Sequence, residues 1–142
     1  MRFLIPIVLA TATLHAAVPT APTGLLVNGI DTPQAIDVTV PSFSWMMNDA
    51  DRGESQTSYQ ILVSSDSSHT GDVWNSGKTA SAQSSAVPYA GPALAPATRY
   101  WWSVKLWDKD DQESPPSAVA TFDTGLSTTD WTASFIWDGT AN

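Results

Sequence analysis

Hydrophobic and polar side chains alternate along residues 94–107. Four hydrophobic residues share one side of this alternation: Tyr100, Trp102, Val104 and Leu106. In an extended chain these side chains lie on one face, because successive residues of a strand point to opposite sides. Aromatic and β-branched residues dominate the segment, which favours a strand over a helix. The pattern therefore predicts a strand that turns these four side chains into a core.

Other segments of the chain show shorter runs of the same kind, separated by turn signals. They are residues 25–27, 41–47, 57–64, 73–78, 84–89 and 119–124. About seven short strands with turns between them are typical of a β-sandwich, so we predict an all-β fold. The core is expected to contain Trp45, Tyr59 and Phe122 beside Tyr100, Trp102 and Val104.

The residues before the longest predicted strand carry a second signal. Leu94, Pro96 and Thr98 lead into Tyr100 at intervals of two. This spacing resembles a tyrosine corner, in which a tyrosine hydroxyl forms a hydrogen bond with the backbone a few residues upstream. Together with Ser114-Pro-Pro-Ser117, the pattern resembles a fibronectin type III module. The resemblance implies a fibronectin type III or immunoglobulin-like β-sandwich over residues 18–125.

The amino terminus has the pattern of an export signal. Arg2 is followed by a mostly apolar run from Phe3 to Leu14 and by small residues at Ala16 and Ala17. The apolar run is too short to span a bilayer and is typical of a signal peptide. We therefore expect residues 1–17 to be removed and the protein to be secreted into the extracellular medium.

The carboxyl-terminal residues 126–142 do not fit the predicted sandwich. Trp131, Ala133, Phe135 and Trp137 alternate there as in a strand, although the earlier strands already complete a domain. An unpaired aromatic strand favours aggregation. We interpret the segment as a linker and the truncated first strand of a following domain; the alternative is that it folds back across the edge of the sandwich.

Charge and composition exclude several classes of function. The sequence of 142 residues has 14% charged residues and a formal net charge of −8. An acidic surface argues against binding to nucleic acid or to an anionic membrane. The chain has no cysteine, so neither disulfides nor thiolate chemistry are available to it.

Two acidic segments are candidates for cation binding. Asp49, Asp51 and Glu54 could hold calcium, but their spacing does not match an EF-hand and an arginine lies among them. Residues 108–113 place four acids within six positions. Both segments are interpreted as solvated loops, and His69 has no partner at a catalytic spacing. We therefore expect no metal, no cofactor and no catalytic residue in this chain.

Several short motifs together resemble one enzyme family. They are Leu25-Leu-Val-Asn-Gly29, Pro41-Ser-Phe-Ser-Trp45, Asp72-Val-Trp-Asn-Ser-Gly77, Arg99-Tyr-Trp-Trp102 and Phe122-Asp-Thr-Gly-Leu126. In this order they resemble the N-terminal region of secreted α-L-rhamnosidases of the inverting type. The version with Asp51-Arg-Gly-Glu-Ser-Gln56 is similar to fungal members.

The resemblance implies a larger parent enzyme. In this family a fibronectin-like module precedes a further β-sandwich and an (α/α)-barrel, which hydrolyses terminal α-L-rhamnose and carries the catalytic carboxylates. The implied partners are the downstream domains of the same polypeptide and, for the parent, rhamnosylated glycans or glycosides. No catalytic residue can be carried over to this chain, which should be inactive alone.

Two hypotheses compete for the outward face of the longest predicted strand. That face is expected to carry Arg99, Trp101, Lys105 and Trp107, with Leu62 on a neighbouring strand. Exposed apolar residues favour a surface that docks the downstream domains, and the chain is then a non-catalytic accessory module. The alternative is a carbohydrate-binding module in which Trp101 and Trp107 stack on sugars and Arg99 or Asp108 supplies hydrogen bonds. A stand-alone adhesion module is suggested by fold analogy only.

Overall fold

The alternating segments form eight β-strands in the computed structural model, which describes residues 17–36, 40–50 and 52–127. The strands are β1 (Thr20–Val27), β2 (Ser42–Asn48), β3 (Ser58–Ser64), β4 (Trp74–Asn75), β5 (Thr79–Ala80), β6 (Val87–Pro88), β7 (Arg99–Trp107) and β8 (Ala120–Asp123). No helix among the described residues is long and apolar enough to cross a membrane. The predicted signal peptide (apart from Ala17) and the alternating residues 131–137 lie outside the described part of the chain.

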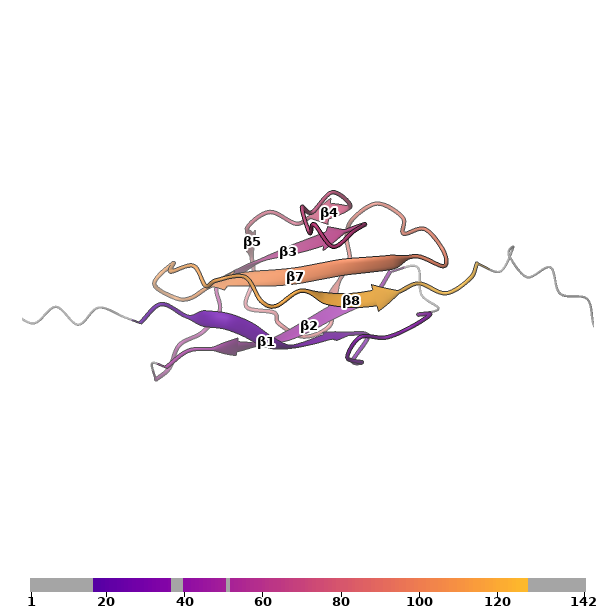
Figure 1. Cartoon of the computed structure of the whole chain (residues 1–142). Coiled ribbons are helices and arrows are strands. Elements are labelled where there is room, and N and C mark those ends of the chain that lie inside the picture. The colour runs from indigo at the N-terminus through magenta and orange to yellow at the C-terminus, as the bar shows by residue number, and fades with distance from the viewer. Residues whose placement is uncertain (1–16, 37–39, 51, 128–142) are drawn as a thin grey trace, which may run out of the picture.

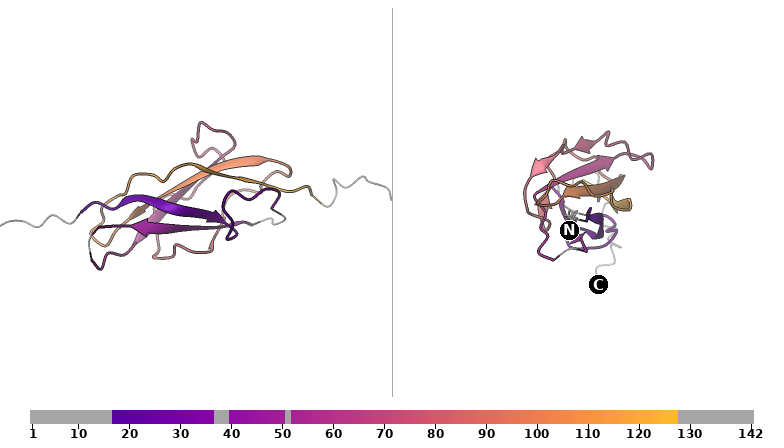
Figure 2. Two further views of the ribbon diagram at one scale, coloured as in Figure 1. Left: turned by 60° about the horizontal axis from the view of Figure 1, so that its bottom comes forward. Right: turned by 90° about the vertical axis from the view of Figure 1, so that its left-hand side faces the viewer.

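The strands are arranged in two antiparallel sheets that pack face to face (Figure 1). The smaller sheet has the order β1-β2-β6, and the larger has the order β4-β3-β7-β8 with β5 also paired to β3. The two layers are visible in the end view of Figure 2. The predicted all-β sandwich is therefore confirmed, with eight strands in place of about seven. The additional strand is β5, whose two residues are too few to show a period in the sequence.

The core lies between the sheets and is mainly aromatic. All six residues that the sequence assigned to it are buried: Trp45, Tyr59, Tyr100, Trp102, Val104 and Phe122. Phe43 joins the two sheets, because its ring lies 4.5 Å from that of Trp102 and 6.0 Å from that of Phe122. Rings at such separations attract each other beyond the effect of burial alone.

The tyrosine corner is formed as the spacing predicted. The hydroxyl of Tyr100 accepts a hydrogen bond from the backbone N–H of Ala95 at 2.8 Å. Since Tyr100 is buried in the core, this bond holds the residues before β7 against the end of the sandwich. The chain therefore enters β7 in a defined register.

The Ser114-Pro-Pro-Ser117 motif forms part of the edge of the larger sheet. The Oγ atoms of Ser114 and Ser117 accept hydrogen bonds from the N–H groups of Leu106 and Val104, each at 3.1 Å. The backbone N–H groups of the same serines donate to the carbonyls of Leu106 and Val104. β8 pairs with the first half of β7, from Arg99 to Trp102. The serine motif pairs with the second half, at Val104 and Leu106, and so covers the rest of the same edge.

Candidate functional site

The five residues predicted to form an outer face lie on one side of the larger sheet. In the register of β3 and β7, Leu62 is opposite Ser103, and Lys105 is opposite Gln60. Directly opposed residues of antiparallel strands point to the same side. Leu62 therefore shares a face with Arg99, Trp101, Lys105 and Trp107, and we call these five residues the outer face of β7.

Trp107 is not exposed on the outer face of β7. Only 7% of this residue is accessible, because Lys78 folds over it from the segment after β4. The Nζ atoms of Lys78 and Lys105 lie 4.6 Å and 5.1 Å from the centre of a Trp107 ring. Such cation–π contacts cover the ring. The expectation that Trp107 offers a free surface for sugars is therefore wrong.

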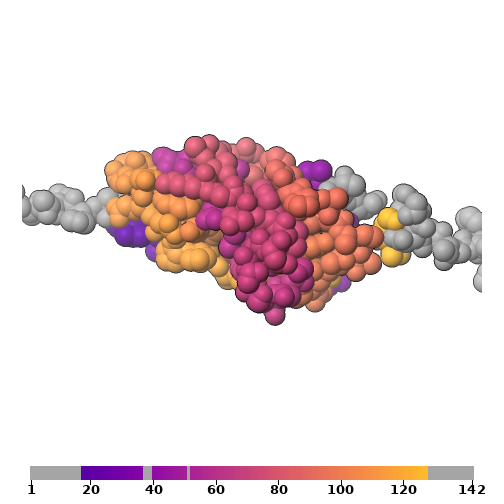
Figure 3. All heavy atoms as spheres, turned by 90° about the horizontal axis from the view of Figure 1, so that it is seen from above, coloured from indigo at the N-terminus to yellow at the C-terminus, as the bar shows by residue number. Residues whose placement is uncertain are grey.

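The remaining residues of this face are accessible to different degrees. Arg99 is exposed, whereas Leu62, Trp101 and Lys105 are half-buried. Part of Leu62 is covered by the loop after β3, where a Cβ added to Gly71 would lie 2.9 Å from Leu62 Cδ2. Figure 3 shows the molecule from above, and the residues between β3 and β5 form the middle of this view in magenta to pink. Of the two tryptophans on this face, Trp101 keeps some accessible surface, whereas Trp107 is buried.

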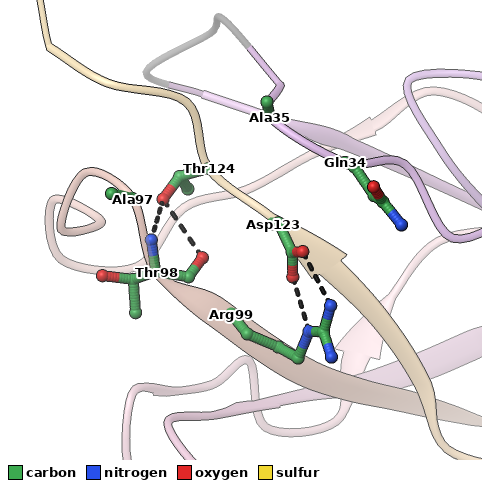
Figure 4. Close-up of a pocket in the computed structure, with 7 residues that line it drawn as sticks. All are labelled: Gln34, Ala35, Ala97, Thr98, Arg99, Asp123 and Thr124. Atoms are coloured by element: carbon green, nitrogen blue, oxygen red, sulfur yellow. Dashed lines mark hydrogen bonds and ion pairs between the residues drawn. The ribbon is translucent and has the colours of Figure 1, made fainter.

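An ion pair marks the beginning of β7. Arg99 donates from Nε and an Nη atom to both carboxylate oxygens of Asp123, at 2.7 and 2.8 Å (Figure 4). The hydrogen bond from Arg99 lowers the pKa of Asp123, and the same bond raises the pKa of Arg99. The guanidinium is therefore already engaged within the domain. An open hollow of about 450 Å³ adjoins the pair, lined also by Gln34 and Thr98.

The chain leaves β8 through a backbone clamp that we define as residues 33–36, 97–98 and 123–125. On one side the N–H of Ile36 donates to Asp123 O at 2.8 Å, and that of Gly125 donates to Ile36 O at 3.0 Å. On the other side Thr124 N donates to Thr98 O, and Ala97 N donates to Gly125 O, both at 2.9 Å. The exit of the chain is thus held from two directions.

The side chain of Thr124 adds further bonds to the clamp. Its Oγ1 accepts from the N–H of Thr98 at 3.0 Å and lies 2.7 Å from Ala95 O, to which it donates (Figure 4 shows the bonds to Thr98). Thr124 is 9% accessible. A valine of the same shape would keep the packing and lose these bonds, so Thr124 is a suitable position for testing the clamp.

The opposite end of β7 carries a group of carboxylates. One oxygen from each of Asp49, Glu54 and Asp108 lies within 4.8 Å of the other two, and we call these residues the acidic cluster. The sequence predicts two separate solvated loops at these positions. The pairing of Ser58 with Trp107 brings the loop before β3 against the loop after β7. The acidic residues of both loops are visible in the sequence. Only the pairing of β3 with β7 shows that the two loops lie together.

Asp108 does not have the role that the sequence suggested for it. It is fully buried, and its Oδ1 accepts hydrogen bonds from the N–H groups of Asp110 and Gln112, both at 2.8 Å. A side chain in this position cannot reach a sugar stacked on the surface. The expectation that Asp108 supplies a hydrogen bond to a surface ligand is therefore wrong.

Comparison with known proteins identifies the family of this sandwich. Residues 22–128 match the family described as "Rha78A-like, N-terminal immunoglobulin domain". The chain belongs to this family. An α-L-rhamnosidase of Formosa agariphila is 45% identical to the Rha78A-like domain over 107 residues, which are 72% of this chain and 11% of that protein.

Solved structures agree with this assignment. The α-L-rhamnosidase from "Dictyoglumus thermophilum" has a TM-score of 0.77 at 39% identity, with 80% of this chain and 13% of that chain covered. The Streptomyces avermitilis α-L-rhamnosidase complexed with L-rhamnose has a TM-score of 0.76 at 40% identity, covering 80% and 11% of the two chains. The Rha78A-like domain described above thus spans about a tenth of the length of these enzymes.

Proposed function

We propose that this Rha78A-like domain is a non-catalytic accessory module of an α-L-rhamnosidase and that it braces the domain that follows it in the polypeptide. The observation that carries the proposal is the backbone clamp. Hydrogen bonds with Ile36 on one side and with Ala97 and Thr98 on the other hold residues 123–125, so the end of the sandwich is fixed as far as Gly125. A fixed exit orients the next domain, whereas a flexible linker would not.

The surfaces near the exit support the same role. The hollow at Arg99 and Thr98 adjoins the clamp, and the half-buried Trp101 lies on the adjacent outer face of β7. Interfaces between domains of one chain are moderately polar and contain aromatic and arginine anchors. A neighbouring domain that contacts Trp101 and fills the hollow would hold the two domains in one relative orientation.

The carboxylates of the acidic cluster are poorly placed for glycoside hydrolysis. An inverting glycosidase needs two carboxyl groups about 6.5–9.5 Å apart, with a sugar site and a water between them. The acidic cluster has oxygens within 4.8 Å of one another and contains the fully buried Asp108. Catalysis is therefore assigned to other parts of the parent enzyme, for which we propose hydrolysis of terminal α-L-rhamnose with inversion.

The first test compares this chain with the longer polypeptide that contains it. A chromogenic α-L-rhamnoside is offered to both, and NMR of the first product identifies its anomer. Turnover by the longer protein only, with inversion, is the expected result. Turnover by the present chain would overturn the non-catalytic assignment. Secretion and a fungal origin stay predictions; cleavage near Ala16 is checked by amino-terminal sequencing of the mature protein.

The second test addresses the bracing role in the longer polypeptide. Thr124→Val removes the side-chain bonds of the clamp, and small-angle scattering should then report a broader distribution of domain orientations. Thr121→Val, at a β8 position without such bonds to the clamp, is the control. An unchanged scattering profile for Thr124→Val would contradict the role of the clamp.

Sugar binding is the alternative function, and it depends on Trp101 because Trp107 is covered. Trp101→Ala separates the two functions in the longer protein. Looser docking with unchanged affinity for rhamnosides supports bracing. A loss of affinity with unchanged domain orientation supports a carbohydrate-binding module.

A further inference from the structure

We propose that the acidic cluster of Asp49, Glu54 and Asp108 binds a calcium ion that joins the two sheets of the sandwich. One carboxylate oxygen of each residue lies within 4.8 Å of the others. Calcium–oxygen distances are about 2.3–2.6 Å, so oxygens on opposite sides of a bound ion are about twice that distance apart. The spacing of the cluster therefore fits one ion between the three carboxylates.

The burial of two of these carboxylates points to a ligand. The side chain of Glu54 is 4% accessible and Asp108 is fully buried. Their oxygens Glu54 Oε2 and Asp108 Oδ2 are shielded from solvent and have no hydrogen-bond partner among the described residues. Buried carboxylate oxygens are normally paired or bound to a metal, because desolvating them alone is costly. A cation would satisfy both oxygens at once.

The negative charge of the site is not balanced by the neighbouring lysine, which favours binding of a divalent cation. Lys109 contacts Glu54 Oε1 and supplies one ammonium group, but its side chain is 46% accessible and it also contacts Asp110. Glu54 and Asp108 alone carry two negative charges, which exceed this single positive charge. The charge that is left uncompensated on the two buried carboxylates calls for another cation.

The donor set selects the kind of ion. All the side-chain donors of the cluster are carboxylate oxygens, which bind hard cations such as Ca²⁺ in preference to zinc or copper. Mg²⁺ requires near-ideal octahedral geometry at about 2.0–2.1 Å. Three side chains from two loops fit the more adaptable coordination of Ca²⁺, with water completing the shell.

The loops are arranged in advance of binding. Asp108 Oδ1 is held by the N–H groups of Asp110 and Gln112, and the carbonyl of Asp108 accepts from Thr57 Oγ1 at 2.7 Å. These bonds fix the carboxylate of Asp108 and leave its Oδ2 for the ion. Asp49 follows β2 of the smaller sheet, whereas Asp108 follows β7 of the larger sheet. The ion would thus link the sheets of a domain that has no cysteine.

The experiment titrates calcium chloride into the chain after removal of metals with a chelating resin. Isothermal titration calorimetry should report one site, with a dissociation constant on the order of 10⁻⁴ to 10⁻³ M, as in extracellular calcium modules. Excess Ca²⁺ should raise the melting temperature by several degrees, because a ligand of the native state stabilises it. Mg²⁺ should give a much smaller rise.

Isosteric variants assign the ion to these residues. Glu54→Gln and Asp108→Asn keep one oxygen for the existing contacts and remove the charge, so each should weaken Ca²⁺ binding at least about tenfold. Asp111→Asn is the matched control in the same loop, because Asp111 pairs with Lys78 outside the cluster. Its Ca²⁺ affinity should be unchanged.

A luminescence measurement keeps the test independent of how the variants fold. Tb³⁺ substitutes for Ca²⁺ at oxygen sites, and Trp107, the residue before Asp108, should sensitise its emission. Addition of Ca²⁺ should then displace Tb³⁺ and quench the signal. Absence of both calorimetric binding and sensitised emission in the folded wild-type chain would overturn the proposal, as would unchanged affinity in folded Asp108→Asn. Neither result would affect the bracing role proposed above.

Discussion

The two faces of β7 differ in what covers them. On the inner face, Tyr100 and Trp102 are buried by the opposite sheet, which the alternation of the strand requires. On the outer face, Trp107 is equally hidden, but it is covered by lysine side chains, one of which comes from the segment after β4. A period of two therefore identifies a core face, whereas the exposure of the other face depends on loops that the period does not describe.

The largest expected effect tests the inner face. Trp102→Ala should lower the free energy of unfolding by about 3–5 kcal/mol, because it leaves a cavity among Phe43 and its neighbours. Urea denaturation followed by circular dichroism measures the change. Trp101→Ala, on the outer face of the same strand, should cost clearly less since this residue is half-buried. Equal losses of unfolding free energy for the two substitutions would contradict the difference in burial between the two faces.

The next effect concerns how the inner face is anchored. Tyr100→Phe leaves the backbone N–H of Ala95 without its acceptor, which should cost about 1–3 kcal/mol of unfolding free energy. Tyr59→Phe is the control, because the Tyr59 hydroxyl has no hydrogen-bond partner among the described residues. Chemical denaturation of both variants compares them directly. A cost for Tyr59→Phe as large as that for Tyr100→Phe would assign the effect to packing.

A smaller effect tests how the outer face is covered. Lys78→Gln removes one cation from Trp107 and should cost about 0.5–1 kcal/mol of unfolding free energy. It should also increase quenching of tryptophan fluorescence by acrylamide. Lys78 additionally pairs with Asp111, so Asp111→Asn serves as the control for loss of the ion pair alone. If Asp111→Asn reproduces both changes, the lysine does not protect the ring.

The smallest effect is a pH dependence at the exposed end of the outer face. Arg99 lowers the pKa of Asp123 below its ordinary value of 3.8. A carboxylate whose pKa is lower in the folded state stabilises it above the unfolded pKa, and this contribution is lost as the pH falls through the folded pKa. Melting curves of wild type and Asp123→Asn should therefore differ at pH 7 and converge in strong acid. A constant difference down to pH 2 would contradict the assignment.

The sequence predicted the inner face well for a physical reason. Burial between two sheets imposes alternation on every core strand, so Trp102 and Phe122 could be placed from their spacing alone. The tyrosine corner was equally local, since Tyr100 and Ala95 are five positions apart. Both features depend on short stretches of chain, where spacing and geometry are nearly equivalent.

The candidate sites were predicted less well because they depend on distant contacts. Lys78 reaches Trp107 only after β4 and β5 have paired with β3, and neither short strand has a readable period. The acidic cluster likewise requires β3 to pair with β7, so that Glu54 meets Asp108. Each acidic loop alone had the composition of an ordinary solvated turn, and no spacing within either loop indicated the other.

The edge formed by Ser114-Pro-Pro-Ser117 has a consequence for self-association. The two prolines have no N–H group, and the neighbouring serines direct theirs inward to β7. Another chain that approached this part of the sheet would therefore find no outward donors with which to extend it. This part of the edge is therefore closed to pairing with a second copy of the module.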